Sequence, residues 1–258
     1  MTKNKAFVYK YIQLIPLLLL IVIERFFREE IDLFLNFVSI SNKGVYSFNS
    51  NTDYQVYRIA WYVCVVLIGY LIYRLPLKTL GLKKQFFKPL LFTFLSCLPI
   101  LLGNLIFNGS YFQSEKIGDS LFSSIVSAMG EEIYFRAFIF VVLFDRFKWH
   151  FVPATLISGF LFGIGHLYQS KDYWDSICIF LITFGGNAWF SWLFVITKRN
   201  LWLPIGMHFF MNLFWDLFET ENTALGGIYP NIFRIITIFL CSFFIYRKYK
   251  SQTIFYTH

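Results

Sequence analysis

Long apolar runs recur along the whole chain between short polar breaks, and this pattern restricts the fold more than any other feature. Most runs approach the roughly 20 residues that an α-helix needs to cross a bilayer. Hydrophobic residues make up 57% of the 258 residues and charged residues only 15%, too few to cover a soluble core. We therefore predict an all-α, polytopic membrane helix bundle. Eight runs are expected to be transmembrane helices: 11–23, 56–73, 89–107, 120–144, 151–168, 176–197, 201–218 and 232–246.

Lysine and arginine residues gather in alternate connections between these runs. One set of connections, which includes both ends of the chain, carries about three times as many of them as the other. Basic residues favour the cytoplasmic side of a membrane, so both termini are predicted to be cytoplasmic. The net charge of +8 is explained by this topology and by attraction to anionic lipid headgroups. We expect one transmembrane domain over residues 1–258, membrane lipids as partners and no nucleic-acid partner; the sequence gives no oligomeric state.

The longest segment predicted on the outer side follows the first run and covers residues 24–55. Within it, Leu33, Phe34, Phe37 and Val38 fall on one face of a helix, which indicates a short amphipathic helix on the membrane surface. A plain ordered loop is the alternative.

The fourth run carries ionisable residues at membrane depth, where a charge is costly unless it is paired or hydrated. Glu132 and Arg136 are spaced i, i+4 and can pair along one helix face. Glu131 is rotated by about 100° from Glu132 and has no such partner on its own helix. One carboxylate is therefore expected to be held by the arginine, while the other faces a different part of the protein.

Two later runs each carry a histidine. His166 follows Phe162 by four residues, and His208 precedes Asn212 by four, so each pair shares a helix face. Each residue also has a purely structural interpretation, because buried histidine and asparagine side chains often join membrane helices by hydrogen bonds.

Gly159 and Gly163, in the same run as His166, are separated by three residues. Two small residues at this spacing allow the backbone of a neighbouring helix to come close. The pattern predicts a tight helix–helix contact next to His166.

Together these side chains suit the hydrolysis of a peptide bond. A carboxylate and an imidazole can share a water molecule and remove its proton, while a second imidazole and an amide N–H can stabilise the resulting oxyanion. The sequence contains no HExxH, GxSxG or GxGD motif, so the common zinc, serine and intramembrane aspartyl protease types are not indicated.

The order of these motifs resembles the CPBP family, the CAAX prenyl protease and bacteriocin-processing family of intramembrane endopeptidases, also called the Abi family. The motifs are Glu-Glu-x-x-x-Arg at 131–136, Phe-x-x-x-His at 162–166 and His-x-x-x-Asn at 208–212, and the resemblance covers about residues 121–218. It implies an endopeptidase that cuts a membrane-bound or lipidated peptide, such as a CAAX protein, a peptide leader, a pheromone or a bacteriocin.

The resemblance also implies a role for each residue. Glu131 and His166 would activate water, and His208 and Asn212 would stabilise the oxyanion. The residues that would support the site are Glu132, Arg136 and Phe162.

Because the family is also described as metalloprotease-like, Glu131, His166 and His208 are alternative zinc ligands; we expect a glutamic peptidase without metal or other cofactor. The alternative function is a non-catalytic immunity or regulatory protein that binds a peptide or a sensor kinase. A proton-coupled transporter is disfavoured because no inverted repeat is visible. The expected location is a bacterial cell membrane, as a multi-pass protein.

The predicted helix ends place the site residues at different depths. At 1.5 Å per residue, Glu131 would lie roughly 18 Å below the outer surface. His166 would lie about 23 Å and His208 about 10 Å above the inner one. Either the helix ends differ by a turn or the helices tilt into a funnel, and the side on which it opens is not indicated.

Overall fold

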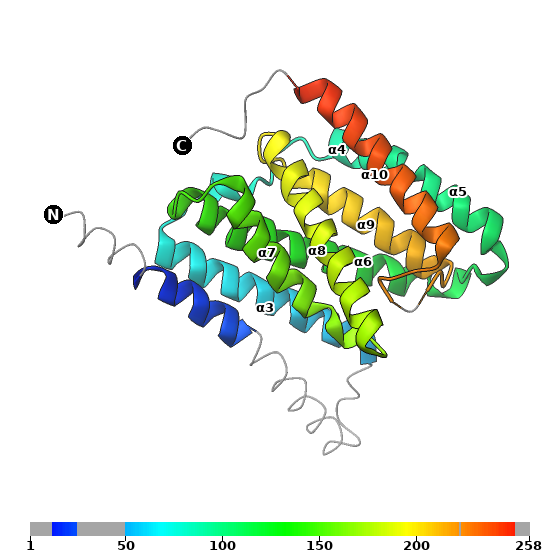
Figure 1. Ribbon diagram of the computed structural model, residues 1–258, viewed down its shortest axis with the longest axis horizontal. Coiled ribbons are helices and arrows are strands. Elements are labelled where there is room, and N and C mark those ends of the chain that lie inside the picture. The colour runs from blue at the N-terminus through cyan, green and yellow to red at the C-terminus, as the bar shows by residue number, and fades with distance from the viewer. Residues whose placement is uncertain (1–11, 25–49, 222, 251–258) are drawn as a thin grey trace, which may run out of the picture. The chain divides into compact units, whose positions relative to one another are not determined.

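The computed structural model describes residues 12–24, 50–221 and 223–250, which lie in helices and their connections (Figure 1). No strand occurs among these described residues, so the all-α prediction is confirmed for them. The chain divides into two compact units, residues 1–76 and residues 77–258. Each unit is described by itself, and a single domain over the whole chain stays a prediction.

The first unit contains two described helices, Leu14–Glu24 and α3 (Ser50–Tyr73). The Tyr73 hydroxyl donates a hydrogen bond of 2.9 Å to the backbone carbonyl of Gln13. This bond joins the end of α3 to the start of the first helix. The amphipathic helix or loop predicted around Leu33 lies outside the described residues.

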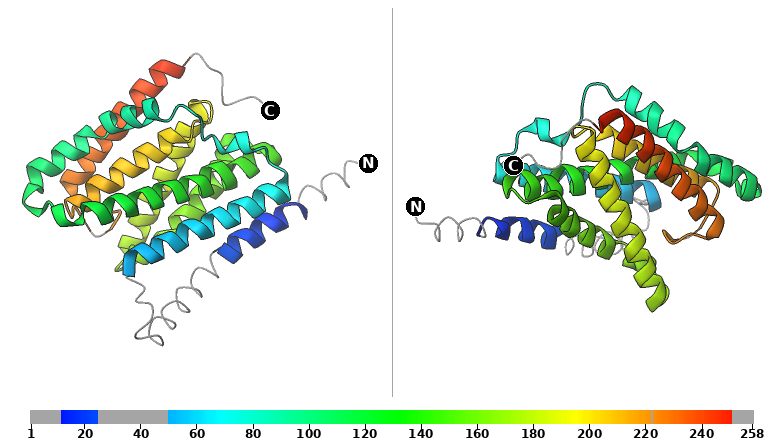
Figure 2. Two further views of the ribbon diagram at one scale, coloured as in Figure 1. Left: turned by 180° about the vertical axis from the view of Figure 1, so that it is seen from behind. Right: turned by 45° about the horizontal axis from the view of Figure 1, so that its top comes forward.

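The second unit is built around one long element. α6 (Ile117–Glu132) continues into π-helical turns, in which most side chains are fully buried. Figure 2 shows this element beside α9 (Trp202–Leu217), against which it packs. The remaining elements of this unit are η1 (Leu77–Leu80), α4 (Phe87–Ser96), α5 (Leu98–Phe107), η2 (Gly109–Tyr111), η3 (Ser114–Lys116), η4 (Ile133–Phe140), η5 (Val142–Arg146), α7 (Phe151–Gly165), η6 (Leu167–Gln169), α8 (Tyr173–Ile196) and α10 (Ile228–Tyr249).

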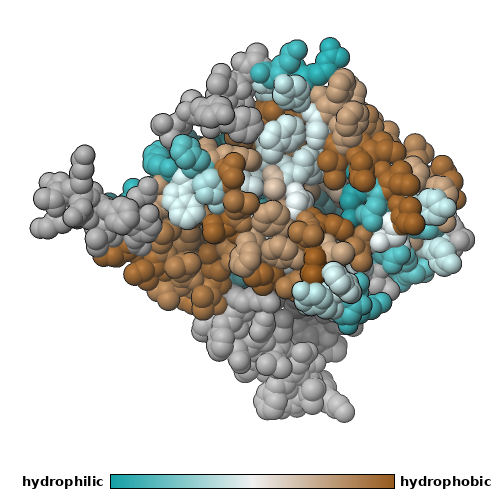
Figure 3. Space-filling view, viewed as in Figure 1, coloured by the Kyte–Doolittle hydropathy of each residue, from teal (hydrophilic) through white to brown (hydrophobic). Residues whose placement is uncertain are grey.

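Apolar side chains cover the outside of the second unit, while several charged ones lie inside it. Ile228, Ile235 and Phe239 of α10 are largely exposed, and Figure 3 shows the hydrophobic surface along this helix. Glu132 and Arg136, in contrast, are fully buried. This distribution suits a lipid environment, in which polar groups must find their partners inside the protein.

Three described helices are long and apolar enough to cross a membrane: Phe151–Gln169, Tyr173–Ile196 and Ile228–Tyr249. The bent pair α4 and α5 adds a fourth if it counts as one span. Apart from Tyr11, which lies outside the described residues, the eight predicted runs fall mainly on helices. The number of eight spans and the cytoplasmic position of both termini stay predictions.

The run 89–107 forms two helices where one was predicted. α4 and α5 meet at Cys97 with a bend of 40°. Pro99, in the first turn of α5, has no N–H to donate, and its ring would clash with the carbonyl of Leu95 in a continuous helix. The prediction of one helix was wrong here because it gave Pro99 no weight.

The two glycines of α7 lie against α8, as their spacing predicts. A Cβ atom placed on Gly159 would lie 3.0 Å from the ring of Phe184, and one placed on Gly163 would lie 2.7 Å from the ring of Phe180. The absence of a Cβ atom therefore allows α7 and α8 to come close. His166 directly follows the last residue of α7, so this contact also holds the histidine's helix in place.

Gly163→Ala is expected to destabilise the protein by about 1–3 kcal/mol, the usual cost of overpacking a core. Gly186→Ala in α8 is the matched control, since a Cβ atom there meets no atom within 4 Å. The same change should be neutral or slightly stabilising at Gly186, because alanine favours the helix. Thermal melts of both variants in detergent measure this difference. Equal melting temperatures would contradict the close packing at Gly163.

Candidate active site

The carboxylate pair ends the α-helical part of the long central element. Glu131 and Glu132 are the last two residues of α6, and Arg136 lies in the π-helical turns of η4 that follow. The Nε of Arg136 lies 3.0 Å from the Oε2 of Glu132, and neither side chain is exposed. This is the i, i+4 ion pair that the spacing predicts. The π-helical winding begins directly after Glu132, and such turns are frequent at functional sites.

His208 joins this pair from α9. Its Nδ1 lies 2.8 Å from the Oε1 of Glu132, and its Nε2 lies 3.8 Å from the Oε2 of Glu131. An ionised carboxylate only accepts hydrogen bonds, so the Nδ1 of His208 carries the proton of the short bond. Glu132 therefore holds both Arg136 and His208, where the sequence predicts only the arginine as its partner.

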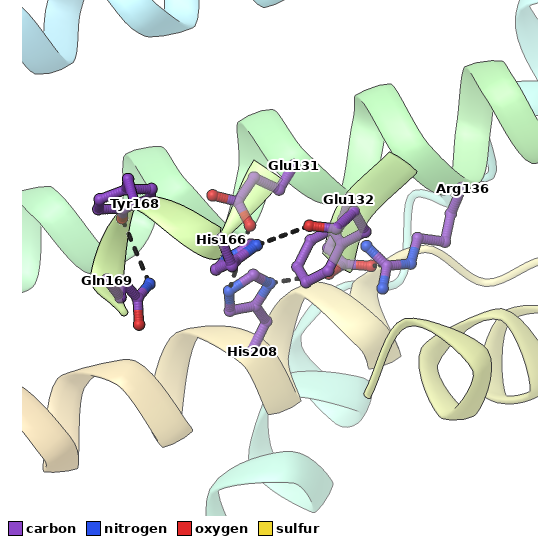
Figure 4. Close-up of polar contacts among 8 residues, drawn as sticks. Glu131, Glu132, Arg136, His166, Tyr168, Gln169 and His208 are labelled. Carbon is purple, nitrogen blue, oxygen red and sulfur yellow. Dashed lines mark hydrogen bonds and ion pairs between the residues drawn. The ribbon is translucent and has the colours of Figure 1, made fainter. Parts of the chain in front are cut away.

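His166 lies at the C-terminal end of α7, at the junction with η6. Its Nδ1 lies 2.8 Å from the backbone carbonyl of Phe162, one turn earlier. A carbonyl oxygen only accepts, so this nitrogen donates, and in a neutral imidazole Nε2 is then the basic nitrogen. Figure 4 shows His166 and His208 on the side of α6 that carries both carboxylates.

The guanidinium of Arg136 lies over two aromatic rings. Its Cζ is 5.2 Å from the ring centroid of Phe162 on α7 and 5.1 Å from that of Phe190 on α8. Both distances are within the range of cation–π attraction. Phe162 belongs to a predicted motif, whereas Phe190 does not. Nothing in the sequence distinguishes Phe190 from the other phenylalanines of its apolar run.

The predicted site residues come from three helices. His208 lies in the second turn of α9, while Glu131 and Glu132 lie midway along the long central element. The contacts between these three residues agree with their predicted depths, since in a layer of roughly 30 Å Glu131 and His208 would lie about 12 Å and about 10 Å above the inner surface. The different level predicted for His166 stays a prediction. Asn212 is half-buried on α9, one turn after His208.

The zinc alternative is not supported by this geometry. In the described part of the chain, no three His, Cys, Asp or Glu side chains are grouped so that they could hold a metal ion. The Nδ1 of His166 lies against Phe162 O and that of His208 against Glu132 Oε1, which leaves both Nε2 atoms available and does not decide between the two mechanisms. The absence of metal from the reaction stays a proposal, and no step below uses a metal ion.

A comparison with protein families decides which family the site resembles. Residues 113–214 match the Rce1-like type II CAAX prenyl endopeptidases. The segment includes every predicted site residue from Glu131 to Asn212, so the resemblance to CAAX proteases is confirmed.

Curated relatives agree with the Rce1-like match. YdiL of Bacillus subtilis, a candidate membrane peptidase, is 38% identical over 99 residues, which cover 38% of this chain and 36% of YdiL. The membrane-embedded CAAX protease MroQ of Staphylococcus aureus is 32% identical over 105 residues, 39% of either chain. YyaK of Bacillus subtilis, an uncharacterised protein, is 28% identical over 113 residues, 43% of this chain and 36% of YyaK.

The matched stretches therefore span less than two-fifths of these relatives. No solved structure gave a significant match. The Rce1-like segment and the apolar helices together indicate an integral membrane protein.

Proposed function

We propose that this protein is an intramembrane endopeptidase that hydrolyses a peptide bond of a membrane-bound or lipidated peptide with water activated by Glu131 and His166. The observation that carries the proposal is the arrangement around the two carboxylates. Glu132 is held between Arg136 and His208, and Glu131 lies beside the second nitrogen of His208. The Rce1-like match over the same residues supports it.

In the proposed reaction, Glu131 and the Nε2 of His166 remove a proton from a water molecule, which attacks the carbonyl carbon of the peptide. The resulting oxyanion receives hydrogen bonds from the Nε2 of His208 and the amide of Asn212. The C–N bond then breaks, and the proton taken from water passes to the leaving amine. No bond forms between the protein and the substrate.

The contacts of His208 support its proposed role. Its Nδ1 is held by Glu132, and its Nε2 is directed toward Glu131. In the proposed reaction Nε2 carries a proton when the oxyanion forms, because an oxyanion is stabilised by a hydrogen-bond donor.

The finer features of the proposal come from the sequence. Eight transmembrane helices with both termini in the cytoplasm would place the site inside a bacterial cell membrane, where lipidated or membrane-anchored peptides are within reach. The distribution of Lys and Arg supports this topology.

The test uses the purified full-length protein in lipid vesicles with a panel of synthetic peptides. The panel contains a prenylated CAAX peptide, its unprenylated form, and an apolar transmembrane peptide, and cleavage is read by mass spectrometry. The proposal expects at least one membrane-associated peptide to be cut, and the unprenylated soluble form to be cut more slowly. Binding of the peptides without cleavage would favour the non-catalytic immunity or regulatory role.

Removal of metal ions is expected to leave cleavage within about twofold of the untreated protein. The reason is that the proposed water is activated by a carboxylate and an imidazole, which need no Lewis acid. The measurement is the cleavage rate after treatment with EDTA or phenanthroline, followed by dialysis. Loss of activity on chelation with recovery on addition of Zn²⁺ would contradict the metal-free mechanism.

A further inference from the structure

Phe190 contacts the site twice. The Cζ of Arg136 lies over its ring, 5.1 Å from the centroid, and the ring is also stacked on the imidazole of His208, with a centroid distance of 5.5 Å and an interplanar angle of 14°. Phe162 makes two equivalent contacts. It lies 5.2 Å from the guanidinium, and its ring centroid is 4.4 Å from that of His166.

The two phenylalanines thus connect both histidines to one central cation. The order of contacts is His166, Phe162, Arg136, Phe190 and His208. Arg136 is itself fixed by its ion pair with Glu132. Each histidine therefore rests against a ring that the buried guanidinium holds in place.

The orientation of His208 requires such a second support. One hydrogen bond from Nδ1 to Glu132 fixes one atom of the imidazole, but the ring can still turn about that point. The nearly parallel ring of Phe190 restricts the plane of the imidazole, and this restriction decides where Nε2 points. In the observed orientation, Nε2 faces Glu131.

We propose that Phe190 is a positioning residue that holds the imidazole of His208 with its Nε2 toward the reacting groups. The proposal rests on the proposed function, because it assigns Phe190 a part in the same reaction. A residue that holds a reacting group in place can affect the rate strongly, because a displacement of the reacting group by about 1 Å can lower the rate roughly 100-fold.

Simple core packing is the competing explanation, and the same helix offers a control for it. Phe190 is 7% exposed and belongs to the apolar core with Leu193 and Met207. Phe194 lies one turn later on α8 and is 0% exposed. Its ring lies beside Gly81, at the start of the connection to α4. Among the described residues, Phe194 makes no ring or cation–π contact with a predicted site residue, so Phe194→Leu removes a buried ring from the same helix without changing such a contact.

The kinetic experiment compares Phe190→Leu, Phe190→Tyr and Phe194→Leu in the purified full-length protein. We expect Phe190→Leu to lower kcat by about 10- to 100-fold with KM within about twofold, and Phe190→Tyr to recover most of this loss because it restores the ring. Phe194→Leu should lower the melting temperature at least as much while kcat stays within about twofold of wild type. Losses of kcat that follow the melting temperature in both leucine variants would overturn the proposal.

A second measurement is independent of peptidase activity. The chain has four histidines, so the imidazole resonances of a histidine-labelled sample can be resolved by NMR and assigned with His208→Gln. The proton shared between His208 and Glu132 should appear far downfield in wild type and in Phe194→Leu, and should shift or broaden in Phe190→Leu.

Phe190→Met, which fills a similar volume without a ring, replaces Phe190→Leu if that variant does not fold. An unchanged resonance would overturn the proposal even if cleavage is observed, whereas a shifted resonance in a protein without activity would refute only the proposed function.

Discussion

Glu131→Gln is expected to lower the rate of peptide cleavage by about 10³-fold or more, while the melting temperature in detergent stays near the wild-type value. General acid–base catalysis contributes typically 10²- to 10⁴-fold, and glutamine keeps the shape of the side chain but cannot take a proton. Glu131 retains 8% exposure, and glutamine has nearly the same size and still accepts hydrogen bonds. The exchange should therefore affect the reaction far more than the fold.

The control for this prediction is Glu219→Gln, which makes the same chemical change outside the site. Glu219 is exposed and forms a surface ion pair with Lys116 at 2.6 Å, a type of contact that contributes little to stability. This variant should cleave at the wild-type rate. Turnover by Glu131→Gln above about a tenth of the wild-type rate would remove Glu131 from the proposed mechanism.

Arg136→Ala and Glu132→Ala are expected to cause the largest losses of stability, about 3–5 kcal/mol each. Both side chains are fully buried, so removal of either leaves an uncompensated charge inside the protein. Arg136→Ala also removes the cation–π contacts with Phe162 and Phe190. The measurement is the midpoint of thermal unfolding in detergent, together with the amount of protein inserted in the membrane.

The double variant Glu132→Ala/Arg136→Ala should recover part of this loss. Both charges of the ion pair are then removed together, so neither remains buried without its partner. The recovery should be incomplete, since His208 also loses the acceptor for its Nδ1. If Glu131→Ala melts below all of these variants and the double variant shows no recovery, the roles of the two glutamates are reversed.

The extent to which the sequence predicts the site depends on how far apart the partners lie in the chain. The ion pair between Glu132 and Arg136 follows from helix geometry, because residues four positions apart share a face. The hydrogen bond between Glu132 and His208 joins residues 76 positions apart, so no pattern of nearby residues predicts it. The sequence therefore identifies both residues but assigns Glu132 only one of its two partners.

Phe190 shows a second limit of sequence patterns. It lies in a run of apolar residues that all suit a membrane helix, and only the packing of α8 against the long central element brings its ring onto Arg136. Pro99 is a different case, since its effect on the helix is a local property. The break at Cys97 could have been predicted had the proline been given more weight than the apolar run around it.

The predicted depths agree with the contacts where the two can be compared. Counting 1.5 Å per residue in a layer of roughly 30 Å places Glu131 and His208 within about 2 Å of one level, and their side chains lie 3.8 Å apart. The different level predicted for His166 stays a prediction, because residue counting assumes upright helices and transmembrane helices are commonly tilted.

The most direct test of the account is peptide profiling of membranes from cells that produce either the wild-type protein or Glu131→Gln at equal levels. The measurement compares the new peptide termini in the two samples by mass spectrometry. A peptidase that depends on Glu131 should produce a small set of termini, in membrane-bound or lipidated proteins, that occur with the wild type and are absent with Glu131→Gln. Identical termini in both samples, together with a cellular phenotype that Glu131→Gln preserves, would contradict the account and identify a non-catalytic protein.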